Sequence, residues 1–339
     1  MSAEVVIGVA TDFTGWFREV VNTFDRARDE GVPVRTVLVD LYAHDWVRNA
    51  QGFDAIVWNP DVMGPISASF FKEKIYFLQH VMNVRVVPNW ESAWHYESKV
   101  AQSYILEALH APRPRTVVSF EREDAAASAQ QLGLPVVAKK SYGAAGRNVM
   151  LLRTQRELDR YLEREFAQQE WDERRARLGS TSRAVASGPL SGWLLEKVRR
   201  AILGGERHGY VYLQEFIDGN DSDLRINVIG RRVAGCRRRN RAGDFRASGS
   251  GQVIRLFELP QDAVDLCVDI RERMGADCLA FDVLYRDGSP LIVEMSYVES
   301  LSSHAVHLVK EADGAFMKVE GEAWDQELWA KHVLEELGF

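Results

Sequence analysis

The chain has 339 residues, of which 46% are hydrophobic and 27% are charged, and its formal net charge is −7. This hydrophobic fraction excludes a disordered protein, and the length is sufficient for roughly two or three domains. The negative net charge argues against a general nucleic-acid-binding protein.

The sequence carries no signal for export or for a membrane span. Its N-terminus lacks a basic region followed by a long apolar run, and no uninterrupted apolar segment approaches about 18 residues. The three cysteines show no CxxC spacing, which indicates neither a disulfide framework nor a zinc site. We therefore expect a cytoplasmic protein with reduced thiols and no membrane partner.

The first 94 residues alternate between strands and helices. Apolar runs predict strands at residues 4–10, 32–41, 54–60 and 84–89, and helices at residues 14–30 and 67–83. This alternation is typical of a small parallel α/β domain. A further helix is predicted at residues 94–110, where two prolines end it. We place a domain boundary near residue 95.

Residues 134–152 predict a strand, a loop that contains Gly143 and Gly146, and a second strand. Small residues let a backbone approach a polyphosphate and direct its N–H groups at the oxygens, while Lys139 supplies a positive charge. The loop lacks the GK[ST] sequence of a Walker loop, and a strand rather than a helix follows it. Taken alone, it is more typical of a plain turn.

Charged and polar residues dominate the next part of the chain. They predict a solvated helix at residues 155–178 and a linker at residues 179–192. A strand at residues 209–217 follows, and then a hairpin formed by residues 224–229 and 233–240.

Arginines crowd the second strand of this hairpin and the loop after it. Guanidinium groups so close together repel one another unless anions lie between them, and arginine presents paired donors that suit carboxylate or phosphate. Because side chains alternate along a strand, Arg238 faces one side while Arg237 and Arg239 face the other. We expect Arg238 to face a local anion site, with Arg246 approaching from the loop. The alternative is a basic strand whose arginines are exposed to solvent and bind no anion.

Residues 279–296 predict two strands joined by a turn at Asp287-Gly288, which is a strong hairpin signal. A turn centred on the glycine places Asp282 opposite Glu294 on one face. The other face is apolar, and its members are Phe281, Val283, Tyr285, Leu291, Val293 and Met295.

The two opposed acids predict a cation site. Like charges about 5 Å apart destabilise a hairpin, and a cation between them removes the conflict. Together with the Ser296 hydroxyl on the same face, the two carboxylates are hard oxygen ligands that suit Mg²⁺ bound with nucleotide phosphates. The alternative is a pair of acids on the wet side of a hairpin.

Three helices are predicted near this hairpin, at residues 261–275, 304–312 and 324–337. His304 and His307 are spaced three residues apart on the second of these helices. We interpret them as packing or surface residues and not as metal ligands.

In this order, the segments resemble the ATP-grasp superfamily, in particular the ribosomal-protein glutamate ligases and, more distantly, glutathione synthetase and D-alanyl-D-alanine ligase. The resemblance covers about residues 95–310. It rests on the stretches VVAKKSYGAAGRNV, QEFI with DSDLR, RRNRAGDFR, and FD with VEMS.

The resemblance implies an α/β fold in which a small parallel α/β domain precedes two antiparallel β-rich lobes that clasp the nucleotide. The implied domains are residues 1–94 and an ATP-grasp domain at residues 95–339. Within the latter, residues 115–213 would form a mobile lid lobe with an extended segment at 153–209, and residues 214–339 the metal and acceptor lobe.

The resemblance also implies site residues. The implied ATP-binding residues are Lys99, Lys139, Gly143, Gly146, Gln214, Glu215, Phe216, Ile217 and Asp223. The two lysines resemble phosphate ligands, the segment 214–217 resembles a hinge that meets adenine, and Asp223 resembles a ribose contact. The arginines around the transferred phosphate or the substrate are Arg225, Arg238 and Arg246. The implied ligands of Mg²⁺, or alternatively Mn²⁺, are Asp282, Glu294 and Ser296.

The chain departs from the family in its metal motif. The family usually ends this motif in Glu-x-Asn, and here the sequence is Glu294-Met295-Ser296. A serine hydroxyl still offers a neutral oxygen, but its shorter reach favours a contact through water.

The chemistry implied is transfer of the ATP γ-phosphoryl group without a protein nucleophile. If the acceptor is a carboxylate, the product is an acyl phosphate that an amine attacks, which gives an amide or peptide bond, ADP and phosphate. The acceptor is then an anionic small molecule or peptide. Two alternatives stay open: a kinase that phosphorylates a hydroxyl of a sugar or polyol, and a non-catalytic nucleotide-binding regulator. A homo-oligomer is compatible with the sequence.

Overall fold

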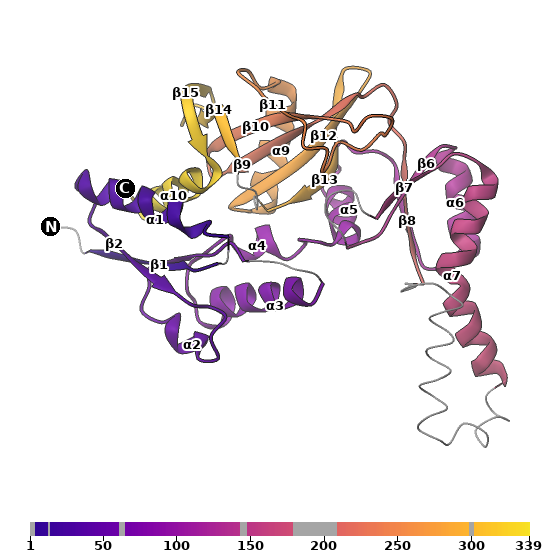
Figure 1. The fold of residues 1–339 in the computed structure, drawn as a ribbon, viewed down its shortest axis with the longest axis horizontal. Coiled ribbons are helices and arrows are strands. Elements are labelled where there is room, and N and C mark those ends of the chain that lie inside the picture. Colours follow the sequence, from indigo (N-terminus) through magenta and orange to yellow (C-terminus); the bar gives the residue numbers. More distant parts are fainter. Residues whose placement is uncertain (1–3, 13, 61–64, 143–147, 179–208, 298–301) are drawn as a thin grey trace. The chain divides into compact units, whose positions relative to one another are not determined.

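A computed structural model describes residues 4–12, 14–60, 65–142, 148–178, 209–297 and 302–339 (Figure 1). The chain forms two compact units. The first comprises Met1–Arg113, Tyr142–Gly146 and Ile217–Phe339, and the second comprises Pro114–Ser141 and Arg147–Phe216.

The first unit begins with a parallel sheet of order β2-β1-β3-β4. Its strands are β1 (Val5–Ala10), β2 (Val34–Val39), β3 (Ala55–Val57) and β4 (Val86–Val87). The helices of this region are α1 (Phe17–Asp29), α2 (Trp46–Asn49), α3 (Pro65–Tyr76), the π-helical turn η1 (Phe77–Val81) and α4 (Trp90–Ala93). Strands alternate with helices in chain order, which confirms the predicted parallel α/β region.

The same unit contains a larger antiparallel sheet of order β13-β12-β9-β10-β14-β15, with β11 also paired to β10. Its strands are β9 (Ser222–Ile229), β10 (Arg232–Arg239), β11 (Val253–Arg255), β12 (Cys278–Arg286), β13 (Ser289–Ser296), β14 (Ser303–Lys310) and β15 (Phe316–Trp324).

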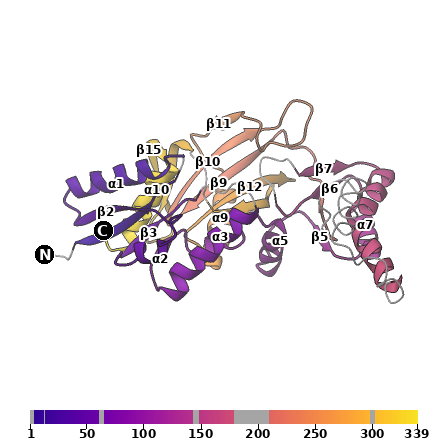
Figure 2. The ribbon, with the colours of Figure 1, turned by 60° about the horizontal axis from the view of Figure 1, so that its bottom comes forward.

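The two faces of this sheet pack against different elements. On one face, Leu224 and Phe281 lie in an apolar core with α5 (Lys99–Ala108) and α9 (Gln261–Met274). On the other face, Ala234 and Ala280 lie in a core that also contains residues of the N-terminal sheet and of α10 (Asp325–Glu336). In both views α10 lies beside α1 (Figure 1, Figure 2). The predicted boundary near residue 95 therefore lies inside one unit.

The second unit is built on an antiparallel sheet of order β5-β8-β6-β7. Its elements are β5 (Thr116–Ser119), α6 (Arg122–Leu132), β6 (Val136–Lys139), β7 (Val149–Leu152), α7 (Gln155–Leu178) and β8 (Val211–Glu215). Side chains of both helices, among them Ala129 and Phe166, pack with the strands in one apolar core. A parallel region followed by two antiparallel β-rich regions is the architecture that the sequence predicted.

The prediction of a helix at residues 304–312 is wrong, because most of these residues belong to the strand β14 (Ser303–Lys310). This strand pairs with β10 on one side and with β15 on the other. Its apolar residues are therefore covered as a strand inside a sheet, and His304 and His307 are strand residues. A short apolar run does not distinguish a buried strand from a buried helix by its spacing.

The prediction of which side chains of β13 face the apolar core is also wrong for part of this strand. Asp282 pairs with Glu294 as expected, but the register shifts beyond this pair, so that Val283 pairs with Ile292. Val293 is thus the extra residue of a β-bulge, so that Leu291 and Ile292, which precede it, lie on the faces opposite to those predicted. Ile292 joins the apolar core, and Leu291 pairs with Leu284 on the other face.

The turn of this hairpin explains the shift. Asp287 and Gly288 both adopt positive φ, at 49° and 79°, as a two-residue hairpin turn requires. Such a turn pairs Arg286 with Ser289, and one extra residue is then needed to bring Asp282 opposite Glu294.

Within the described parts of the chain, no helix combines the length and the apolar character that crossing a bilayer requires.

Candidate functional site

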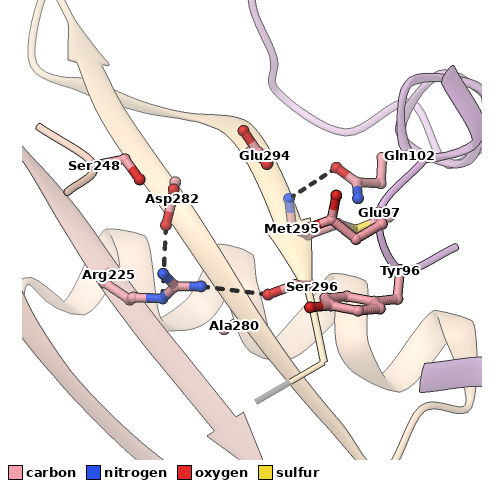
Figure 3. Close-up of a pocket in the computed structure, with 10 residues that line it drawn as sticks. All are labelled: Tyr96, Glu97, Gln102, Arg225, Ser248, Ala280, Asp282, Glu294, Met295 and Ser296. Carbon is pink, nitrogen blue, oxygen red and sulfur yellow. Dashed lines mark hydrogen bonds and ion pairs between the residues drawn. The ribbon is translucent and has the colours of Figure 1, made fainter. Parts of the chain in front are cut away.

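Neighbouring strands of the large sheet bring polar residues together on one face. Asp282 on β12 pairs with Glu294 on β13 and with Arg225 on β9. One step along the ladder, Ala280 pairs with Ser296. These residues line an open pocket within the first unit (Figure 3). The complete lining is Tyr96, Glu97, Gln102, Arg225, Ser248, Ala280, Asp282, Glu294, Met295 and Ser296.

Lys99 lies at the start of α5, after Ser98, whose side chain caps the helix by accepting from the backbone N–H of Ala101. Its Nζ lies 2.8 Å from Oε1 of Glu294, and its side chain is only 6% exposed. Burial lowers the pKa of Lys99, but the nearby carboxylates, foremost Glu294, outweigh burial and raise it. The structure therefore brings a predicted phosphate lysine to a predicted metal ligand.

Arg238 faces the site, whereas Arg237 and Arg239 are exposed, which confirms the predicted alternation along β10. Its Nε and one terminal nitrogen donate to the two oxygens of Asp223 at 2.8 and 2.6 Å. The same terminal nitrogen lies 2.8 Å from Asp282. The sequence predicted that anions lie between the crowded arginines. At Arg238 these anions are the carboxylates of Asp223 and Asp282.

Asp223 was predicted as a ribose contact, and here it holds Arg238. Burial raises the pKa of Asp223, the hydrogen bond from Arg238 lowers it, and the charge of Asp282 raises it again, to about 6 in total. The pKa is raised because two acids share one guanidinium in a poorly solvated place.

Arg225 joins the acids and the serine. Its Nε lies 3.8 Å from Asp282, and a terminal nitrogen donates to Oγ of Ser296 at 3.3 Å (Figure 3). By contrast, Arg246 donates to Asp244 of its own loop at 2.8 and 2.5 Å. That loop contributes Ser248 to the pocket lining.

The second unit contains the other predicted lysine. Lys139 is buried at the end of β6, with its Nζ 5.8 Å from the centre of the Tyr212 ring. Lys140 pairs with the buried carboxylate of Glu165 on α7. The side chains of the two lysines thus lie on opposite faces of the strand, as the alternation predicts. Gly143 and Gly146 lie outside the described residues.

The predicted hinge, residues 214–217, spans the point where the second unit ends and the first resumes, between Phe216 and Ile217. Within the second unit, Gln214 donates to the Thr116 hydroxyl at 3.1 Å. Glu215 pairs with Arg115 at 3.2 Å. Both contacts tie β8 to the start of β5.

The pocket lining also includes residues that were not predicted as site residues, among them Tyr96, Glu97 and Gln102. Glu97 adopts a positive φ of 55°, which is uncommon outside glycine and is often found at functional sites. Gln102 accepts from the backbone N–H of Met295 at 3.4 Å (Figure 3). The available signal was their proximity to Lys99, since a helix that starts at a site also brings its flanking residues there.

The donors around the pocket fit a hard divalent cation. Glu97, Asp282 and Glu294 supply carboxylate oxygens, and Ser296 supplies a hydroxyl. Oxygen donors of this kind suit Mg²⁺, whereas zinc sites favour nitrogen and sulfur. The arrangement therefore fits the metal that the sequence predicted.

A second group with ligand chemistry, Asp277, His332 and Glu336, brings its donor atoms within 4.8 Å of one another. Arg85 donates to Asp277 at 2.6 and 3.0 Å and also to Glu336. The guanidinium thus already neutralises these acids, so we interpret the group as a buried ion-pair network.

Comparison with known proteins shows what this chain is similar to. Residues 196–313 match the family model described as the RimK-like ATP-grasp domain. One curated relative, the alpha-aminoadipate–LysW ligase LysX of Saccharolobus solfataricus, is 23% identical over 274 residues, which are 80% of this chain and 86% of the relative.

Two solved structures show the same fold. The RimK domain ATP-grasp protein from Sphaerobacter thermophilus DSM 20745 has a TM-score of 0.54 and 19% identity, over 87% of this chain and 92% of that one. The D-alanine–D-alanine ligase from Bacillus anthracis complexed with ATP has a TM-score of 0.55 and 14% identity, over 88% and 87%. The chain therefore has the ATP-grasp fold, and its residues 196–313 are similar to the RimK-like ATP-grasp domain.

Proposed function

We propose that this protein is an ATP-dependent ligase that activates a carboxylate as an acyl phosphate and joins it to an amine, with release of ADP and phosphate. The observation that carries the proposal is the facing pair Asp282 and Glu294, with Lys99, Arg225 and Arg238 around it. Acids that can hold a metal beside cations that can hold phosphate are what phosphoryl transfer requires. The match to a RimK-like domain and the similarity to a named ligase support the same reading.

We assign the phosphates of ATP to Lys99 and Lys139, and the metal to Asp282 and Glu294 with the Ser296 hydroxyl. Bound Mg²⁺ neutralises charge on the phosphates. Gln214–Ile217 are assigned to adenine, Gly143 and Gly146 to the phosphates, and Asp223 to the ribose.

We assign the transferred phosphate and the acceptor carboxylate first to Arg225, because its side chain lines the pocket beside Ser296. Arg238 is held by Asp223 and Asp282, so its role in this proposal is to fix Asp282 and to stabilise the charge that develops during transfer. Arg246 acts from its loop. The acceptor is an anionic small molecule or peptide.

The test is turnover with defined products. The protein is incubated with ATP, Mg²⁺ and pools of carboxylates and amines, and ADP, free phosphate and new amides are measured by coupled assay and mass spectrometry. Hydroxylamine, added in place of the amine, should give a hydroxamate, since it traps an acyl phosphate. Glu294→Ala should abolish these signals, because it removes a metal ligand. Exposed Glu322, which pairs with Arg255, provides the control variant Glu322→Ala.

The products also separate the alternatives. Free phosphate together with an amide supports the ligase. A phosphoester that accumulates with ADP supports the kinase and overturns the ligase. Nucleotide binding without turnover in any pool supports a regulator.

A further inference from the structure

The predicted metal ligands are paired with cations of the chain itself. Lys99 lies 2.8 Å from Glu294, and Arg238 lies 2.8 Å from Asp282. The lysine and arginine side chains are only 6% and 9% exposed, while Glu294 is 34% exposed. These are therefore not surface ion pairs that water screens.

Lys99 interacts with three acids. Besides Glu294, the carboxylates of Glu97 and Asp282 interact with it electrostatically. It is also the first residue of α5, where the positive end of the helix dipole disfavours a cation. A buried ammonium in this place needs an anion, and if it loses Glu294 it needs another one.

The same two side chains are needed for two different ligands. Under the proposed function, Glu294 holds the metal and Lys99 holds a phosphate, and neither can do so fully while they hold each other. A metal that binds alone at Glu294 must displace the ammonium and leave it next to a second positive charge. A nucleotide that binds without metal must draw the ammonium away and leave the acids unneutralised.

We propose that Lys99 is an internal counter-ion of the metal site, which is exchanged for the metal when nucleotide phosphates arrive. This inference rests on the proposed function and goes beyond it, because it makes the protein discriminate against metal alone and against nucleotide alone. Binding of one component frees the side chain that the other requires, so the two affinities are linked.

The first experiment measures metal binding without nucleotide. Free Mn²⁺ is followed by electron paramagnetic resonance during titration of the protein. Lys99→Met keeps an apolar stem but removes the charge, so Mn²⁺ should bind at least about tenfold more tightly than to the wild type. Lys99→Arg keeps the charge and should bind Mn²⁺ as weakly as the wild type. Lys310→Met, which breaks a lysine–glutamate pair of 2.7 Å away from the pocket, should leave the affinity unchanged.

The second experiment measures nucleotide binding without metal. ADP is titrated by calorimetry in the presence of a chelator. Glu294→Gln releases Lys99 for phosphate, so metal-free ADP should bind at least about tenfold more tightly than to the wild type. A structural role of the pair predicts the opposite sign, because loss of a buried partner weakens the fold and its ligand affinity.

Unchanged or weaker Mn²⁺ binding to folded Lys99→Met overturns the proposal, and so does unchanged or weaker binding of metal-free ADP to Glu294→Gln. If Lys99→Met does not fold, as judged by circular dichroism, the ADP result with Glu294→Gln decides alone. Wild-type protein that binds Mn²⁺–ADP while the variants show no gain contradicts only this inference. Wild-type protein that binds neither ADP nor Mn²⁺–ADP overturns the proposed function together with it.

Discussion

At the scale of single residues, the site contains acids that repel one another and basic side chains that each contact more than one of these acids. Asp223 and Asp282 are held by one guanidinium, that of Arg238, and the pKa of Asp223 rises to about 6 through burial and the neighbouring acid despite that hydrogen bond. Arginine suits this position because its planar fork donates to both oxygens of Asp223 and also reaches Asp282, and an ammonium lacks this paired geometry.

Arg238→Lys should therefore lower turnover by at least about tenfold, or ~1.4 kcal/mol of transition-state stabilisation, because the charge stays but the fork is lost. Arg237→Lys should be nearly silent, since this side chain is exposed on the other face of β10. Steady-state kinetics on both variants check the prediction. Equal losses, or a larger loss at Arg237, would contradict the assignment of Arg238 to the site.

His95 illustrates a residue whose burial affects stability. It is fully buried, and this burial, with a smaller contribution from Lys72, lowers its pKa to about 3. The unfolded chain binds a proton near pH 6.5 and the folded protein does not, so the stability that His95 contributes is present above pH 6.5 and is lost as the pH falls towards 3.

Between pH 7 and pH 5, His95 should thus reduce the free energy of unfolding by about 2 kcal/mol. His95→Gln removes this titration, so its stability should fall less over the same interval. Urea denaturation of both proteins at the two pH values measures the difference. An identical pH dependence would show that His95 does not titrate on unfolding in this range.

At the scale of elements, alternation along strands was the most reliable signal in the sequence. It predicted that Asp282 faces Glu294 and that Arg238 faces away from Arg237, and both predictions are confirmed. It failed beyond Asp282, because alternation assumes an unbroken register and a bulge breaks it. The spacing of apolar residues also misled at β14, which was predicted as a helix but pairs with the distant strand β10 and with the next strand, β15.

The same alternation places Lys139, the last residue of β6, and Lys140, the residue after it, on opposite faces. Lys139→Ala should weaken ATP binding at least about tenfold, since the phosphate loses a charged partner. Lys140→Ala should leave ATP affinity near the wild-type value and instead lower the melting temperature, because Glu165 keeps a buried charge. Calorimetry and thermal unfolding of both variants check this. The reverse pattern would mean that the strand is shifted by one residue.

At the scale of the whole molecule, residues far apart in the sequence share one core. Residues of the N-terminal sheet, of the large sheet and of α10 pack together in the first unit. Arg85 reinforces this junction, because it precedes β4 and pairs with Asp277 and with Glu336 of α10. Asp277 is only 6% exposed, so it depends on this partner.

Arg85→Met should destabilise the protein by about 3 kcal/mol, because it leaves a buried carboxylate without its guanidinium. Arg35→Met is the matched control, since Arg35 and Glu4 form an exposed pair of 3.3 Å and its loss should cost less than about 0.5 kcal/mol. Urea denaturation of the two variants measures both values. A similar small effect at both positions would argue against the network at Arg85 as a main tie between the N-terminal sheet and α10.

The sequence by itself determined the parallel α/β region, the hairpin at Asp287-Gly288 and the alternation that separates Arg238 from Arg237 and Arg239, because these depend on local spacing and turn chemistry. Only the tertiary structure decided that Lys99 meets Glu294, that Arg238 holds Asp223 and Asp282, and that Glu97 joins the pocket. The physical reason is that an ion pair forms between whichever charges the packing of distant elements buries together, and no local pattern encodes that choice.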